Sequence, residues 1–266
     1  MRPDPVVSAA SWCRRRRARR NWSPRAAQPS LRSKRIRTMS EFVDYQVKDG
    51  VATLTMNDGK ANAFGIPMTS ALSAGLDRAA DEAEVAAIKG KPGLFCAGYD
   101  LKVINGPKDG VRAMVESGAE LLMKAYMHPQ PLIIGCTGHA VAAGALLLCT
   151  ADYRIGVSGD FKIGLNETSI GLGLPTYGLE LARDRLDNRQ LNNATMGAQL
   201  YSPATAVEIG YPDEAIPPGA FEDAIAAKAE YLKTLDGAAY AQVKQRLRCT
   251  REALIRSAMQ AEMDAR

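Results

Sequence analysis

The sequence contains two runs of small residues, Phe95-Cys96-Ala97-Gly98-Tyr99-Asp100-Leu101 and Gly138-His139-Ala140-Val141-Ala142-Ala143-Gly144, from which its fold can be worked out. Each predicts a tight turn that leaves a strand, and the second leads into the apolar helix expected over 144–150. Small residues at turns usually just allow close packing. They can also leave backbone N–H groups bare at a helix start, and two such groups that converge form an oxyanion hole.

Strands and helices are predicted to alternate around these runs. Two alternating segments, 42–47 and 51–56, flank Lys48-Asp49-Gly50, which indicates a β-hairpin. The other strands are expected at 85–88, 131–136, 152–156 and 161–163, and helices from Pro67, at 111–127 and at 144–150. Only helices are expected after that, at 176–186, 188–196, 203–209, 219–235 and 238–262. This order predicts an α/β core over 39–200 and a helical region over 201–266.

The charge of the 266-residue chain is unevenly distributed. Residues 1–38 hold eleven Arg and one Lys against one Asp, a net charge of +11. The chain totals are 34 basic and 29 acidic residues, so residues 39–266 carry 22 and 28 and have a net charge of −6. The basic character therefore belongs to an N-terminal arm, which we expect to be disordered because it has too little apolar mass to pack.

Several interpretations of this arm compete. It could bind nucleic acid, or it could be a mitochondrial-type transit peptide, which is rich in Arg and poor in acids. A twin-arginine export signal is excluded because no apolar segment follows the arginines. We favour a simpler interpretation, in which Met39 is the true start and residues 1–38 are an upstream extension without a role. Mass spectrometry of the native N-terminus tests this, and a mature chain that begins at Met1 would contradict it.

The composition excludes several kinds of active site. No nucleotide-binding glycine loop and no H-E-x-x-H motif occurs, and His128 and His139 are the only histidines, so we predict no metal site. The five cysteines form no C-x-x-C pair, which indicates reduced thiols and a cytoplasmic location. No apolar run is long enough to span a membrane. Proton transfer must then depend on carboxylates, Tyr, Lys or backbone groups.

Four segments in this order resemble the crotonase (enoyl-CoA hydratase/isomerase) superfamily. They are Met56 to Phe64, Phe95 to Lys102, Thr137 to Ile155, and Ile163-Gly164-Leu165-Asn166-Glu167-Thr168. The resemblance covers residue 42 to the C-terminus. It implies a ββα spiral core, a C-terminal helical region that forms homotrimers or hexamers, and an acyl-CoA substrate. It implies no separate cofactor, because coenzyme A is part of the substrate, and no membrane or nucleic-acid partner.

The resemblance also implies which residues form the site. The backbone N–H groups of Tyr99 and Ala143 would hold the thioester oxygen. The residues expected to bind coenzyme A and the acyl group are Lys60, Ala61, Ala63, Ala97, Gly98, Asp100, Leu101, Gly144 and Leu146. Lys60 and Lys102 could lie near the phosphates, although exposed lysines are more often only solvated.

The carboxylates indicate the reaction. Hydratases of the superfamily use two glutamates; here the first position is Leu146 and the second is Glu167. One carboxylate can move a proton between two carbons, so we predict isomerisation of 3-enoyl-CoA to trans-2-enoyl-CoA in fatty-acid oxidation, with Glu167 as the base. Its neighbours are expected to be apolar and to raise its pKa.

Two other functions stay open. Asp100, Glu116 or Glu120 could supply a second carboxylate, which would favour an enoyl-CoA hydratase. Alternatively, the protein could bind acyl-CoA without turnover, with Glu167 only pairing with nearby donors.

Overall fold

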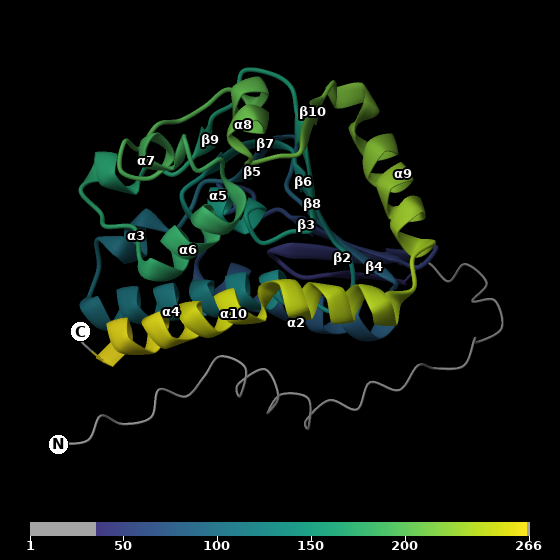
Figure 1. Ribbon diagram of the computed structural model, residues 1–266, viewed down its shortest axis with the longest axis horizontal. Coiled ribbons are helices and arrows are strands. Elements are labelled where there is room, and N and C mark those ends of the chain that lie inside the picture. The colour runs from purple at the N-terminus through teal and green to yellow at the C-terminus, as the bar shows by residue number, and fades with distance from the viewer. Residues whose placement is uncertain (1–35, 265–266) are drawn as a thin grey trace.

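The computed structural model describes residues 36–264, whose strands form two sheets (Figure 1). Within this part of the chain, the larger sheet has seven strands in the order β1-β2-β3-β4-β6-β8-β10, and the smaller sheet has three in the order β5-β7-β9. The strands are β1 (Ile36–Met39), β2 (Val43–Lys48), β3 (Val51–Met56), β4 (Val85–Lys89), β5 (Gly93–Cys96), β6 (Leu132–Cys136), β7 (Gly138–Val141), β8 (Tyr153–Val157), β9 (Ile163–Gly164) and β10 (Glu214–Ile216).

Helices follow the strands and make up most of the C-terminal part. The α-helices are α2 (Ile66–Glu82), α3 (Leu101–Ile104), α4 (Lys108–Tyr126), α5 (Ala143–Leu148), α6 (Thr176–Arg185), α7 (Leu191–Ala194), α8 (Pro203–Ile209), α9 (Phe221–Lys233) and α10 (Gly237–Asp264). Two 3-10 helices are η1 (Glu167–Ile170) and η2 (Pro218–Ala220). None of the helices within residues 36–264 is both long and apolar enough to cross a membrane.

A strand-strand-helix unit repeats between β4 and α6. Of each strand pair, β4 and β5, β6 and β7, and β8 and β9, the first strand joins the larger sheet and the second joins the smaller one. Helices α3 and α4 follow the first pair, α5 follows the second, and η1 and α6 follow the third. The predicted α/β fold, with a ββα spiral core and C-terminal helices, is confirmed.

Four strands, β1, β5, β7 and β10, were not expected from the sequence, and β5 begins at Gly93, where the preceding strand was expected to have ended. Residues 138–141 form β7 instead of the start of a turn, and β10 adds a short parallel strand next to β8 from within the predicted helical region. Both are three or four residues long, too short for an alternating pattern to show. Strand β1 pairs with β2 and includes the last three residues of the predicted arm, so the prediction of disorder is wrong there. Residues 1–35 of the arm lie outside the described residues.

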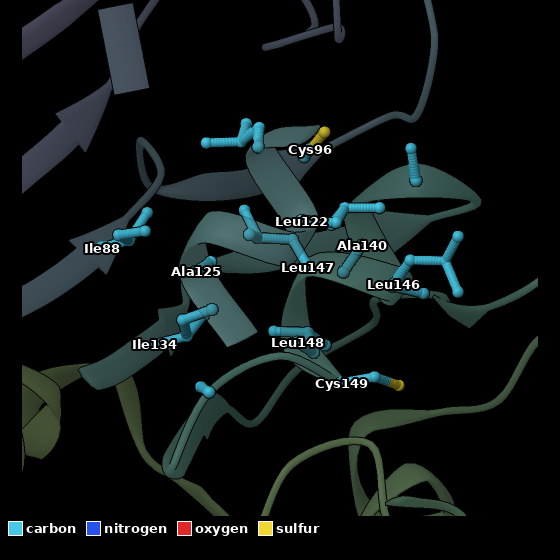
Figure 2. Close-up of a cluster of buried hydrophobic side chains, with 14 of the residues drawn as sticks. Ile88, Cys96, Leu122, Ala125, Ile134, Ala140, Leu146, Leu147, Leu148 and Cys149 are labelled. Atoms are coloured by element: carbon cyan, nitrogen blue, oxygen red, sulfur yellow. The ribbon is translucent and has the colours of Figure 1, made fainter. Parts of the chain in front are cut away.

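The two sheets and helix α5 enclose the core. Helix α5 is buried along its whole length. Figure 2 shows Leu147 and Leu148 on the side of α5 that faces Ile88 and Ile134, and Leu146 turned to the other side. On that other side, Leu146 lies close to Gly178 at the start of α6. Helix α5 therefore joins the core to the region around α6.

A buried ion cluster connects helix α10 to the core. Its centre is Asp152, which precedes β8. Asp152 accepts hydrogen bonds from Lys244 Nζ at 2.5 Å and from the backbone N–H of Leu132 at 2.7 Å, and it forms an ion pair with Arg248 at 2.9 Å. Lys244 and Arg248 are 6% and 3% exposed. Burial lowers the pKa of Lys244 to about 8, and the Asp152 charge opposes this shift. A single carboxylate thus pairs with two buried cations.

Replacing Asp152 by Ala is expected to lower the free energy of unfolding by about 3–5 kcal/mol, because two buried cations lose their counter-ion. Urea unfolding monitored by circular dichroism measures this change. Asp77 provides a matched control, since it accepts a 2.6 Å bond from Lys124 but its side chain is 69% exposed. Asp77→Ala should change stability by at most about 1 kcal/mol. Equal losses in the two variants would show that the buried cluster does not hold α10 in place.

Candidate active site

The residues expected to form a site meet at one edge of the smaller sheet. Strands β5, β7 and β9 are parallel neighbours, with Cys96 opposite Ala140 and Val141 opposite Gly164. The segments that follow parallel strands emerge at the same edge of a sheet. This edge therefore brings together the two turns of small residues and the segment that holds Glu167.

The first turn, at the end of β5, leaves one backbone N–H group without an acceptor. Gly98 has a φ of +93°, and its carbonyl accepts a 2.8 Å bond from the Phe64 N–H. Asp100 ends the turn by accepting a 2.9 Å bond from the Lys102 N–H, as expected of a residue that caps its own turn. The N–H of Tyr99, between them, donates no hydrogen bond to any residue in 36–264.

A buried asparagine holds the neighbouring segment 60–63 against this turn. Asn62 is fully buried and donates to the carbonyls of Met56 and Phe95 at 3.2 and 3.0 Å. Beside it, Ala61 accepts a 3.1 Å bond from the Ala97 N–H. This positioning role of Asn62 was not predicted from the sequence; its place within a short polar loop was the available signal.

The second turn, between β7 and α5, presents a similar bare N–H group. Ala142 has a φ of +53°, an unusual value for a residue with a side chain. Ala143 is the first residue of α5, and its N–H donates to no described residue. The next residue, Gly144, lies against Cys96, where a Cβ atom would overlap the Cys96 carbonyl oxygen. A glycine is therefore needed here for the two turns to approach each other.

The two turns are in contact. A Cβ atom built on Gly98 would lie 2.8 Å from the Ala142 Cβ and 3.5 Å from the Ala143 nitrogen. The bare N–H of Tyr99 belongs to the residue after Gly98, so the two unpaired donors lie on adjoining backbone segments. Donors placed in this way can hydrogen-bond one oxygen atom between them.

Glu167 lies at the same edge, shortly after β9 ends and at the start of η1. Its Oε2 atom is buried and has no hydrogen-bond partner among the described residues. Burial raises the pKa of this carboxyl above its ordinary value of 4.5, although the nearby backbone N–H groups of Glu167 and Asn166 oppose the shift. A partly desolvated carboxylate with a raised pKa is suited to accept and return a proton.

Comparison with known proteins identifies the family. Residues 46–266 match the family model described as enoyl-CoA hydratase/isomerase. The chain belongs to this family. A solved enoyl-CoA hydratase/isomerase family protein from Pseudomonas syringae has 38% sequence identity and a TM-score of 0.83, and the match covers 85% of this chain and 99% of that one.

Curated relatives of the family carry the names of both reactions. Mitochondrial enoyl-CoA delta isomerase 1 of Mus musculus is 25% identical over 207 residues, covering 76% of this chain and 70% of its own. A probable enoyl-CoA hydratase of Rhodobacter capsulatus is 29% identical over 208 residues, covering 76% of this chain and 79% of its own. The protein is therefore an enzyme of the enoyl-CoA hydratase/isomerase family, and its carboxylates must indicate which reaction it catalyses.

The other candidate carboxylates of this enoyl-CoA hydratase/isomerase family member are already engaged. Asp100 caps its own turn, and Glu116 pairs with Arg112 at 2.8 Å on the same helix. Glu120 is exposed and pairs with Arg256 at 3.3 Å. Leu146, where the resemblance to hydratases leads one to expect their first glutamate, is buried beside Gly178. Among the carboxylates considered from the sequence, Glu167 is the one with a buried oxygen atom, Oε2, that lacks a hydrogen-bond partner in the described part of the chain.

Two tyrosines near this edge form a partly buried pair that was not predicted from the sequence. The Tyr99 hydroxyl lies 2.9 Å from the Tyr177 hydroxyl and donates a 3.4 Å bond to the Val115 carbonyl. Burial raises the pKa of the Tyr99 phenol, and the neighbouring Tyr177 and the Glu167 carboxylate raise it further. The tyrosines are 78 residues apart, so no local sequence pattern could have linked them.

The remaining predicted binding residues lie along the outer side of the first turn. Lys60 is exposed, and its carbonyl accepts a 2.5 Å bond from Lys91 Nζ, which places two lysines side by side. Ala97 and Leu101 are exposed, and Ala61 and Ala63 are half-buried. Lys91 was not predicted as a site residue. Within the part of the chain that the structure describes, no group of three or more His, Cys, Asp or Glu residues could hold a metal ion.

Proposed function

We propose that this enzyme shifts the double bond of a 3-enoyl-CoA thioester to give the trans-2-enoyl-CoA isomer. The single observation that supports this choice is the unpaired, buried Oε2 atom of Glu167, with Leu146 in place of a second carboxylate. One carboxylate suffices for a proton transfer within the substrate, whereas the addition of water by this family is expected to need two.

In the proposed mechanism, the N–H groups of Tyr99 and Ala143 donate hydrogen bonds to the thioester oxygen. Glu167 removes a proton from C2, and the electrons of the broken C–H bond form a dienolate whose negative charge lies on that oxygen. The two donors stabilise this charge more than the neutral carbonyl, and this lowers the barrier. Glu167 then returns the proton to C4, and the double bond moves to C2–C3. The proposal assigns no separate cofactor.

The coenzyme A part of the substrate would lie along the first turn. We assign its contacts to Lys60, Ala61, Ala63, Ala97, Gly98, Asp100 and Leu101, and those of the acyl group to Gly144 and Leu146. The net charge of residues 39–266 is −6, so an anionic ligand needs a local basic surface. The neighbouring Lys60 and Lys91 provide one beside the segment 60–63.

One observation favours hydration of 2-enoyl-CoA as the alternative. The buried Asn166 Oδ1 and the hydroxyls of Tyr201 and Tyr211 lack hydrogen-bond partners among the described residues, like Glu167 Oε2. Burial raises the pKa of the Tyr211 phenol, and the Cys149, Tyr201 and Glu167 charges raise it further. Unpaired polar atoms of this kind can hold a buried water molecule.

An assay with paired substrates distinguishes these functions. An isomerase produces the ultraviolet absorbance of the conjugated enone thioester from 3-enoyl-CoA. A hydratase removes this absorbance when mixed with crotonyl-CoA. A protein that only binds acyl-CoA does neither, although it binds the ligands in calorimetry. Loss of absorbance from crotonyl-CoA without any gain from 3-enoyl-CoA would refute the proposed isomerisation.

We also propose that the enzyme is a homotrimer or a hexamer. The outer face of α10 exposes Val243, Leu247 and Leu254, with fractional exposures of 61%, 75% and 50%. Apolar side chains this exposed on one helix are more typical of an interface than of a free surface. Sedimentation equilibrium should give three or six times the mass of the chain. The mass of a single chain at micromolar concentration would refute this proposal.

A further inference from the structure

The Tyr99–Tyr177 pair lies between the proposed reaction centre and a hollow that the mechanism does not use. Tyr99 has its backbone N–H at the centre, while its ring extends away from it to α4. There the ring edge faces Phe64 at a centroid distance of 6.1 Å and lies over Gly118, where a Cβ atom would be 2.6 Å from a ring carbon. The Tyr99 ring thus occupies the space that a side chain at position 118 of α4 would need.

Tyr177 closes the same space from α6. Its side chain is 3% exposed, and the following residue, Gly178, would bring a Cβ atom within 3.1 Å of Leu146 and 3.0 Å of Leu174. An acyl chain that extends from the two N–H donors past Glu167 and Leu146 would therefore meet Tyr177 next. The 2.9 Å contact between the two hydroxyls links Tyr177 on α6 to Tyr99.

The hollow is lined by residues of α4, of the start of α6 and of the C-terminal part of α10. Figure 1 shows these three helices near one another. Its apolar lining is Val115, Ala119, Pro175, Tyr177 and Met259. Arg112, Glu116 and Glu262 add charged groups to the lining. Tyr177 belongs both to this lining and to the hydroxyl pair, so its side chain contacts the hollow as well as Tyr99.

We propose that the Tyr99–Tyr177 pair is the end wall of the acyl site and restricts this enzyme to short acyl chains. The inference rests on the proposed function, since it takes the thioester oxygen to lie between Tyr99 and Ala143. A longer chain would have to separate the two hydroxyls and break the hydrogen bond between them, which is unfavourable inside the protein. The hollow would add to the space open to a longer chain if the Tyr177 side chain were absent.

The test is a chain-length profile of kcat/KM for 3-enoyl-CoA substrates with four to twelve acyl carbons. For the wild-type enzyme we expect kcat/KM to fall at least about tenfold between six and ten carbons. Tyr177→Ala should raise the ratio of ten-carbon to six-carbon kcat/KM at least about tenfold, because each added methylene can then be buried in the hollow. Tyr177→Leu, which keeps an apolar side chain in the core, should change the ratio in the same direction by less.

Met259→Ala is the matched control. It enlarges the hollow on the far side of Tyr177, so alone it should leave the profile unchanged, whereas with Tyr177→Ala it should extend the profile further. An unchanged ratio in both Tyr177 variants, with their folding verified by circular dichroism, would overturn the proposal. Equal kcat/KM of the wild-type enzyme for six-carbon and ten-carbon substrates would also overturn the proposal.

A binding series separates this inference from the proposed reaction. The affinities of saturated acyl-CoA esters of the same lengths are measured by calorimetry with wild-type and Tyr177→Ala protein. If no isomerisation occurs at any length, the proposed function fails, and the affinities still test the wall. The proposed wall is supported if the wild-type protein prefers short chains and Tyr177→Ala removes this preference. It is overturned if the affinities rise equally with chain length in both proteins.

Discussion

Replacing Glu167 by Gln is expected to lower kcat for isomerisation by at least about 1,000-fold, since it removes the group that accepts and returns the proton. The affinity for a saturated acyl-CoA ester should change by less than about threefold, because amide and carboxyl groups have nearly the same shape. Stopped-flow absorbance and calorimetry measure the two quantities. Glu120→Gln is the control: this exposed glutamate pairs with Arg256 away from the site, and its replacement should leave kcat unchanged.

The same substitution should increase stability at neutral pH. The pKa of Glu167 is higher in the folded protein than its ordinary value of 4.5, so the folded state binds a proton more tightly than the unfolded state. Glu167 therefore decreases stability as the pH rises from 4.5 through its raised pKa, and the loss persists above it. The Glu167→Gln variant avoids this loss, because an amide does not ionise. The gain in melting temperature should be present at pH 7 and should disappear below pH 4.5.

A carboxylate that merely stabilised the fold would give a different result. Its replacement would lower the melting temperature at pH 7 and would leave much of the turnover. The pH dependence of wild-type kcat/KM adds a further test, since activity should be lost as the pH falls through a pKa above 4.5. Retained turnover in the Gln variant would remove Glu167 from the mechanism.

The second large effect is expected from Gly98→Ala. The added methyl group would lie 2.8 Å from the Ala142 Cβ and 3.5 Å from the Ala143 nitrogen, in the space proposed for the thioester oxygen. We expect kcat/KM to fall at least about 100-fold, comparable with the loss of one oxyanion donor. Stability should also fall, because a φ of +93° disfavours a side chain.

Gly93, at the other end of β5, separates these two effects. Its φ is +82°, and a Cβ atom there would have no neighbour within 4 Å. Gly93→Ala should therefore lose about 1 kcal/mol of stability from the backbone conformation alone and keep its activity. If the two variants had equal kcat/KM, the space between the turns would not hold the reacting carbonyl.

The local structure of this protein could largely be predicted from its sequence. The buried residues of α2 are Met68, Thr69, Leu72, Leu76 and Ala79 with Gly75, which is the helical spacing expected after Pro67. The hairpin around Gly50 and the long helix α10 were also located within a few residues. Local patterns suffice for such elements because burial on one face repeats with the period of the helix or strand.

The short strands could not be predicted from such local patterns. Strand β7 consists of Gly138-His139-Ala140-Val141, with no β-branched run, and it is a strand because it lies between β5 and β9. A Cβ atom on Gly138 would overlap the backbone of Gly93, so close packing with β5 selects this residue. Pairing with distant neighbours, and not a local preference, decided its conformation.

The sequence by itself determined the family resemblance, the alternation of strands and helices, and the replacement of one hydratase glutamate by Leu146. Only the tertiary structure decided that the turns at Gly98 and Ala142 touch, that Glu167 Oε2 is buried without a partner, and that Tyr99 meets Tyr177. The physical reason is that the local pattern of apolar and polar residues indicates which side chains are buried. The distance between residues far apart in the chain depends on how all the intervening strands and helices pack, and the chemistry of the site depends on those distances.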